Sequence, residues 1–336
     1  MLKDTVESFP NSMSEPYLLL ASLLSSSSVA APPSLPILPW EQGWSKLNVI
    51  NWIKLPKSAA QAYPGSVDTS PPEFSTTQAT TVTRKPTIPT SFNQRTKLAP
   101  HSGSQLYQQR KAALRAGQLY TRLATDSFYP AWSKAKQQPT HQQWQKLLAR
   151  EAQVLAYGQG NNQLGIILGD SLSMWFPSQL LPSGKFWLNQ GISGENSGQI
   201  LTRLPTLQAN QPNTIYVMAG INDLRQGASD RVILHNIRSI MGNLRQSHPQ
   251  AYIIVQSILP TRNHPISNQR IRNLNRQIML IAQEEGVSYL NLYPLFRDEQ
   301  NQMRPELTTD GIHLSRQGYQ VWQAALNHTE SLIALR

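Results

Sequence analysis

The clearest pattern in this 336-residue chain is the regular alternation of short apolar runs with longer amphipathic stretches after residue 160. Short buried strands that alternate with helices form a parallel sheet covered on both faces, so the pattern predicts an α/β domain over 161–336. We expect strands at 164–168, 186–188, 214–219, 252–259 and 287–292, and helices at about 196–208, 229–247, 267–285 and 315–333.

A second pattern, with helical spacing, precedes this domain over 104–160. Its second half opens at Thr140, with Gln143 three residues later, which is the spacing of a capping box. Apolar residues from Trp144 to Leu155 then share one helical face. We therefore expect a helical extension that packs on the C-terminal domain.

The stretch 32–103 has the composition of a linker. Of the 24 prolines in the chain, 13 lie in the first 100 residues, and Ser, Thr and Gln replace large apolar residues from about 56 onward. Such a segment buries too little apolar surface to offset its chain entropy. We predict a largely disordered Pro/Ser/Thr-rich linker.

Residues 1–31 have features of an export signal. An apolar run at 17–24 is followed by serines, and Ser28 and Ala30 supply small residues at cleavage-type positions. The acidic Glu7 and Glu15 before the run argue against a signal peptide, so a disordered N-terminus is the alternative. We favour a periplasmic, extracellular or surface location over a cytoplasmic one. No run approaches the roughly 18–20 apolar residues of a membrane span.

The net charge of +11 is uneven, with +8 in residues 1–160 and +3 in 161–336. The basic N-terminal part suits a weak contact with an anionic membrane or a polysaccharide, although a solvated basic face is the commoner meaning of such charge. No nucleic-acid-binding signature is present, so we expect no nucleic-acid partner.

The absence of cysteine excludes disulfides, thiolate metal sites and thiol catalysis. We expect neither a cofactor nor a metal.

The first candidate catalytic residue lies directly after the first expected strand. The chain reads Gly-Asp-Ser-Leu there, and its serine is Ser171. A serine hydroxyl is a poor nucleophile unless a base removes its proton. Of seven histidines, His313 alone has an aspartate, Asp310, three residues before it. One carboxylate at that spacing can orient the imidazole. Taken singly, Ser171 is more commonly a turn residue than a nucleophile, and His313 is more commonly a surface histidine than a base.

Two further residues suit the stabilisation of an oxyanion. Gly191, in Asn-Gln-Gly, leaves its N–H open to a substrate oxygen, and Asn222, in Gly-Ile-Asn-Asp, supplies a side-chain amide. A tight turn and an Asx-turn are the alternatives for these two residues. All four motifs lie at strand ends or before the last helix, where parallel sheets form their sites. Ser173 replaces the second glycine of Gly-x-Ser-x-Gly, which argues against an α/β-hydrolase nucleophile elbow.

At these motifs the chain resembles the SGNH, or GDSL-type, hydrolase family over about 161–330. The resemblance implies a three-layer, flavodoxin-like sandwich with a five-stranded parallel sheet and hydrolysis of esters or thioesters. It implies that Ser171 is the nucleophile, His313 the base and Asp310 its partner. It also implies that the oxyanion is bound by the N–H groups of Ser171 and Gly191 and by the side chain of Asn222.

We therefore expect a serine hydrolase that cleaves small acyl esters, of acetylated sugars or lipids, through an acyl-enzyme on Ser171. A thioesterase and a lysophospholipase are alternatives within this class. A non-enzymatic carbohydrate- or surface-binding module is the alternative outside it, although the intact set of motifs argues against it. Trp175, Phe176 and Trp187 are candidates either for the acyl pocket or for the core.

Overall fold

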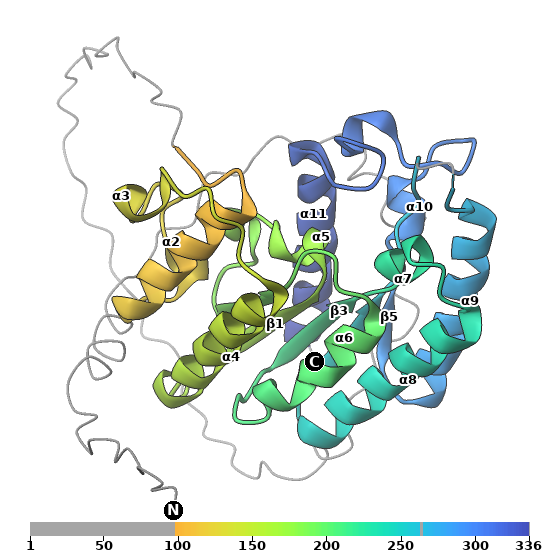
Figure 1. Cartoon of the computed structure of the whole chain (residues 1–336). Helices are drawn as coiled ribbons and strands as arrows, with labels where there is room; N and C mark the ends of the chain where they lie inside the picture. Colours follow the sequence, from red (N-terminus) through yellow and green to blue (C-terminus); the bar gives the residue numbers. More distant parts are fainter. Residues whose placement is uncertain (1–97, 263–264, 336) are drawn as a thin grey trace, which may run out of the picture.

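The computed structural model describes residues 98–262 and 265–335, which are coloured in Figure 1. The predicted signal peptide at 1–31 and all but the last residues of the predicted linker at 32–103 lie outside the described residues.

A five-stranded parallel sheet with strand order β2-β1-β3-β4-β5 forms the centre of the described molecule (Figure 1). This is the flavodoxin-like order, and it confirms the α/β class that the apolar pattern predicts. The strands are β1 (Leu164–Gly169), β2 (Phe186–Gly191), β3 (Thr214–Met218), β4 (Tyr252–Gln256) and β5 (Ser288–Leu290).

The second strand is longer than predicted. β2 continues through Asn189 and Gln190 to Gly191, which pairs with Gly169 of β1. Asn189 and Gln190 are polar, and polar residues are expected to end a buried strand. In the structure, both of these side chains are buried and hydrogen-bonded. The amide of Asn189 donates to the Ser173 carbonyl at 2.7 Å, and the amide of Gln190 donates to the Leu148 carbonyl at 3.2 Å. Because these carbonyls accept from the amide nitrogens, the two polar residues can remain inside the molecule.

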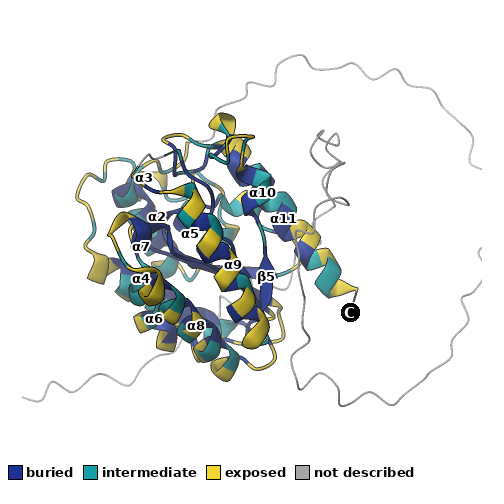
Figure 2. Ribbon diagram, turned by 90° about the vertical axis from the view of Figure 1, so that its right-hand side faces the viewer, coloured by how far each residue is buried: buried dark blue, intermediate teal, exposed yellow. Residues whose placement is uncertain are grey.

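Helices cover both faces of the sheet, and alternate strand residues face opposite layers. In β1, Ile166 and Leu168 join the apolar cluster of one helical layer, whereas Ile167 joins the cluster that contains Trp322. The buried sides of the helices face the sheet, and their exposed sides face outward (Figure 2). One layer holds α4 (His141–Gly158), α6 (Ser197–Arg203), α8 (Asp230–Ser247) and α9 (Asn268–Glu284); the other holds α5 (Ser171–Met174), α10 (Tyr293–Phe296) and α11 (Arg316–Ala334).

The helix predicted at 196–208 is divided. α6 ends at Arg203, and a 3-10 turn, η4 (Leu204–Leu207), follows it. Pro205 lies at the start of this turn and has no N–H to continue the helical ladder. The remaining short elements are α3 (Tyr129–Trp132), α7 (Ile221–Arg225), η2 (Tyr120–Arg122), η3 (Ser178–Leu180) and η5 (Pro305–Leu307).

The segment before the sheet forms α2 (Gly103–Arg115) and α4, which contact each other, and α4 also contacts β2. Figure 1 shows α4 beside the sheet. Thr140 caps α4, and both hydrogen bonds of the predicted capping box are present. Arg110 of α2 pairs with Glu151 of α4 inside the molecule and also donates to the Asn189 carbonyl at 2.7 Å. These helices therefore share a buried interface with the end of β2. None of the helices in the described ranges is long and apolar enough to cross a bilayer.

Candidate active site

Ser171 is the first residue of α5, at the carboxyl end of β1. The preceding Asp170 caps this short helix, since its side chain accepts the N–H of Leu172 at 2.9 Å. The Ser171 hydroxyl lies 3.2 Å from Nε2 of His313, which is 142 positions away in the chain. The sheet therefore brings the predicted serine and histidine within hydrogen-bonding distance.

His313 is held by the loop between η5 and α11. Its Nδ1 lies 2.6 Å from a carboxylate oxygen of Asp310, and the second oxygen accepts the backbone N–H of His313 at 2.7 Å. Gly311 has φ of +92°, a left-handed conformation that favours glycine, and so lets the chain turn back between the two. Ser315 caps α11, as its place in the sequence predicts.

The protonation of this pair follows from the hydrogen bonds. An ionised carboxylate only accepts, so Nδ1 of His313 carries the hydrogen and Nε2 is left to accept from Ser171. Partial burial raises the pKa of Asp310, but hydrogen bonds from the His313 ring and from two backbone N–H groups outweigh it. The pKa of Asp310 therefore lies below its ordinary value. At neutral pH, Asp310 is therefore ionised and accepts the Nδ1 hydrogen of His313.

Asn222 lies in the first turn of α7, directly after β3, and only 2% of it is exposed. Its amide nitrogen donates to the Glu195 carbonyl at 3.0 Å and to a carboxylate oxygen of Asp170 at 3.3 Å. Its amide oxygen accepts from Arg225 at 3.0 Å. These three contacts hold the amide at the same end of the sheet as Ser171.

Gly191 differs from the sequence expectation. Its N–H donates to the side-chain oxygen of Asn189 at 3.0 Å, so this group is not open to a substrate. The reason for glycine at this position is steric, because a Cβ would lie 2.1 Å from the backbone nitrogen of Met174 in α5. Gly191 therefore allows β2 and α5 to approach closely.

Comparison with known proteins identifies the fold and its chemistry. Residues 155–321 match the model of the GDSL-like Lipase/Acylhydrolase family. Residues 155–321 belong to this family. The chain is accordingly an ester hydrolase, which agrees with the resemblance that the sequence motifs show.

Individual relatives share moderate identity with the chain. The platelet-activating factor acetylhydrolase IB subunit alpha1 of Pongo abelii is 28% identical over 169 residues, which are 46% of this chain and 69% of the relative. The human subunit is 27% identical over 170 residues, with the same two shares.

The chain is also similar to solved structures. One described as a platelet activating factor from Streptococcus pneumonia is 26% identical, with a TM-score of 0.51 over 56% of this chain and 93% of that one. A GDSL-like lipase from Bacteroides thetaiotaomicron is 22% identical, with a TM-score of 0.49 over 56% and 98%.

The sequence did not single out a second glycine of this segment, Gly194. Gly194 lies three residues after Gly191 and has φ of +83°, and no atom lies within 4 Å of where its Cβ would be. Within the part of the chain that the structure describes, no hydrogen bond of its N–H is found. The spacing Gly-Ile-Ser-Gly contains both glycines, so the signal was present but did not distinguish them.

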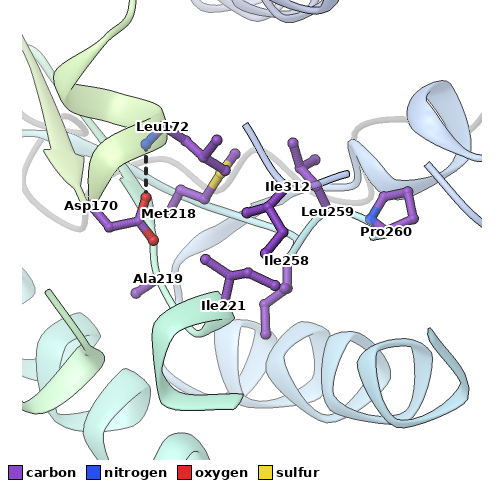
Figure 3. A pocket seen from close by; sticks show the side chains of 9 residues that line it. All are labelled: Asp170, Leu172, Met218, Ala219, Ile221, Ile258, Leu259, Pro260 and Ile312. Atoms are coloured by element: carbon purple, nitrogen blue, oxygen red, sulfur yellow. Dashed lines mark hydrogen bonds between the residues drawn. The ribbon is translucent and has the colours of Figure 1, made fainter. Parts of the chain in front are cut away.

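Asp170, the aspartate of the Gly-Asp-Ser-Leu motif, has an unusual environment. It is fully buried, and burial raises its pKa to about 7 against the opposing hydrogen bond from Leu172. Figure 3 shows Asp170 beside a small apolar cavity of about 10 Å³, a volume on the scale of one water-sized sphere. Its lining includes Leu172, Ile221 and Ile312, the chain neighbours of Ser171, Asn222 and His313.

The three aromatic candidates have different surroundings. Trp187 is buried in the core and donates to the Pro182 carbonyl at 2.7 Å. Trp175 and Phe176 line a separate cavity of about 220 Å³ between α2 and the segment after α5. In the described ranges, no three His, Asp or Glu side chains gather in a way that could hold a metal ion.

Proposed function

We propose that this GDSL-like hydrolase cleaves carboxylic esters of short acyl groups through an acyl-enzyme on Ser171. The observation that carries the proposal is the continuous relay from the Ser171 hydroxyl to His313 Nε2, at 3.2 Å, and from His313 Nδ1 to Asp310, at 2.6 Å. This is the geometry of a nucleophile, a base and an orienting carboxylate.

The reaction has two halves. The Ser171 oxygen attacks the acyl carbonyl while Nε2 of His313 takes its proton, and Asp310 stabilises the imidazolium that forms. His313 then gives this proton to the departing alkoxide, and the acyl group stays on Ser171. In the second half, His313 takes a proton from water, which attacks the acyl carbon, and then returns that proton to Ser171 as the ester bond breaks.

Three donors are proposed for the oxyanion: the N–H groups of Ser171 and Gly194 and the amide of Asn222. Neither N–H has another partner among the described residues. The amide of Asn222 has its shorter bond to Glu195 and its longer one, at 3.3 Å, to Asp170. We infer that it keeps the first and turns its second hydrogen from Asp170 to the developing charge.

Two observations favour a short acyl group such as acetyl. The cavity bordered by the neighbours of Ser171, Asn222 and His313 has a volume of only about 10 Å³, which suits a methyl group better than a long chain. The relatives named as acetylhydrolases share 27–28% identity with this chain over the matched region. The alcohol part of the ester, whether sugar or lipid, lies outside this cavity.

The proposal is tested with p-nitrophenyl esters of increasing acyl length and with the variant Ser171→Ala. We expect kcat/KM for the acetate to exceed that for the octanoate by at least about tenfold, since an apolar pocket discriminates by roughly 10–200-fold per methylene. Ser171→Ala loses both this activity and covalent labelling by a fluorophosphonate.

Each result separates the proposal from a rival. Equal rates for acetate and octanoate would overturn the short-acyl assignment and favour a lysophospholipase-type lipase. A faster reaction with acetyl thioesters than with oxygen esters would favour a thioesterase. Absence of turnover on every ester, together with absence of labelling, would favour the binding module.

A further inference from the structure

The loop that connects β2 to α6, residues 192–196, supports the oxyanion donors. It contains Gly194, and the carbonyl of Glu195 accepts the shorter hydrogen bond of the Asn222 amide, at 3.0 Å. Any shift of the Glu195 backbone therefore moves both Gly194 and the acceptor that orients Asn222. The position of this loop sets the geometry of two of the three proposed donors.

The Glu195 side chain anchors this loop inside the protein. It is fully buried, and each of its carboxylate oxygens has a partner. Arg203 of α6 donates to one oxygen at 2.7 Å and also to the Gln190 carbonyl at 2.5 Å, which fixes it to the end of β2. His141 Nε2 lies 2.9 Å from the other oxygen.

His141 belongs to another part of the chain. It is the first residue of α4, where the Thr140 capping box fixes the start of the helix. It lies before residue 155, where the match to the GDSL-like family model begins. Around it, Trp144 and Leu148 of α4 pack in one apolar cluster with Ile192, the first residue of the loop. The start of α4 therefore contacts the loop through both a polar and an apolar contact.

The pairing matters because a buried carboxylate is costly unless it is hydrogen-bonded. Without His141, whose side chain is 39% exposed, one oxygen of the buried Glu195 carboxylate would lose its protein partner. The carboxylate would then have to turn toward water or toward Arg203. Either movement pulls on the backbone whose carbonyl holds Asn222, and displacements of about 1 Å at a catalytic donor can cost about 10²-fold in rate.

We propose that His141 is a positioning residue for ester hydrolysis, which holds Glu195 and, through the Glu195 carbonyl, the oxyanion amide of Asn222. The inference rests on the proposed function of Asn222 as a donor. It makes the N-terminal helical extension a working part of the active site rather than a separate attachment. The imidazole itself touches neither the substrate nor the reacting atoms.

The test compares two replacements of His141 in the full chain with a neighbouring control. His141→Leu removes the hydrogen bond, whereas His141→Gln keeps an N–H group at about the reach of Nε2. Gln142→Ala is the control, because Gln142 is the next residue of α4 and is exposed. For each variant, kcat and KM on p-nitrophenyl acetate are measured together with the melting temperature.

We expect His141→Leu to lower kcat about tenfold, less than the 10²–10³ lost when a donor is removed outright. KM should stay within about twofold, since the lost interaction acts in the transition state. His141→Gln should recover kcat to within about threefold of the wild type, because an amide N–H still reaches Glu195. Gln142→Ala should match the wild type.

A double-mutant cycle with Asn222→Ala distinguishes positioning from general support of the fold. If His141 acts through Asn222, His141→Leu should lower kcat by less than about twofold in the Asn222→Ala background, because the two effects are then not additive. A tenfold loss in both backgrounds, or a loss in Gln142→Ala equal to that in His141→Leu, would overturn the inference.

The result for Ser171→Ala separates this inference from the proposed function. Loss of activity in Ser171→Ala together with wild-type kcat in His141→Leu would overturn the role of His141 alone. Full activity in Ser171→Ala would overturn the proposed function and this inference with it.

Discussion

The carboxyl group of Asp170 has an environment that opposes its ionisation. It is fully buried, and burial raises its pKa from 3.8 to about 7. The folded protein therefore binds a proton that the unfolded chain releases between about pH 4 and 7, so stability falls as pH rises through this window. Asp310 acts in the opposite sense and at lower pH, because its pKa is lowered.

Replacement of Asp170 by Asn should remove this dependence. Asn keeps the shape and the N-cap function but does not titrate. We expect the free energy of unfolding of the wild type, relative to Asp170→Asn, to fall by up to about 1.4 kcal/mol per pH unit between pH 5 and 7 and to level off above. Urea denaturation at pH 5, 6, 7 and 8 measures this difference.

Taking the difference between the two proteins removes the contribution of His248, whose pKa is lowered by burial and which both chains contain. A difference that stays constant over this pH range would show that Asp170 is ionised throughout.

At the residue scale, the sequence allowed some positions to be identified and left others hidden. Ser171, Asn222 and His313 stood out because each follows a strand or precedes a helix at a spacing with chemical meaning, and the structure brings them to one end of the sheet. The sequence does not distinguish Gly191 from Gly194. The two glycines differ in the backbone angle φ and in the hydrogen-bond partner of the N–H, which only the structure reveals.

His141 gave no such signal. Its partner Glu195 lies 54 positions away, and no spacing rule links a helix start to a loop in another part of the fold.

At the scale of elements, β2 packs closely against α5, the short helix that begins at Ser171. The two backbones are so close that a Cβ at Gly191 would meet Met174 at 2.1 Å. We expect Gly191→Ala to lower the free energy of unfolding by about 3 kcal/mol or more, the upper range for overpacking, because backbone atoms cannot move aside as a side chain can. Chemical denaturation measures the change.

Gly242→Ala is the matched control for that substitution. Gly242 lies inside α8, and the nearest atom to its Cβ position is 4.0 Å away. Alanine there should stabilise the protein by up to about 1 kcal/mol through helix propensity. Equal stabilities of the two variants would contradict the steric role of Gly191.

The apolar pattern located all five strands because buried parallel strands are short and continuous in apolar residues. It was weakest at the ends of elements, where tertiary contacts outweigh local preference. β2 continues through Asn189 and Gln190 because the Ser173 and Leu148 carbonyls accept from their amides, and neither acceptor is adjacent in the sequence. The division of the helix after Arg203 was readable in principle, since Pro205 marks it.

At the scale of the whole molecule, the helices before the sheet and the domain that matches the GDSL-like family share one interior. Ala152 and Leu155 of α4 belong to the same apolar cluster as Leu164 of β1. Nearer the start of α4, Trp144 and Leu148 pack with Met174 of α5. A boundary at residue 160, which a change of composition suggests, therefore cuts through packed side chains.

Two truncations test this continuity. A chain that begins at residue 98 keeps α2, α4 and every contact of the site described above, so we expect a cooperative thermal transition and kcat on p-nitrophenyl acetate within about twofold of the full chain.

A chain that begins at residue 161 loses α2 and α4. Since the loss of a single buried Leu side chain costs about 2–5 kcal/mol, the removal of several such side chains exceeds the stability of an ordinary domain of about 5–15 kcal/mol. We expect no cooperative transition for this shorter chain, as measured by circular dichroism on heating. A folded chain from residue 161 with wild-type kcat would show that the catalytic domain is independent and that the start of α4 is dispensable to the loop it contacts.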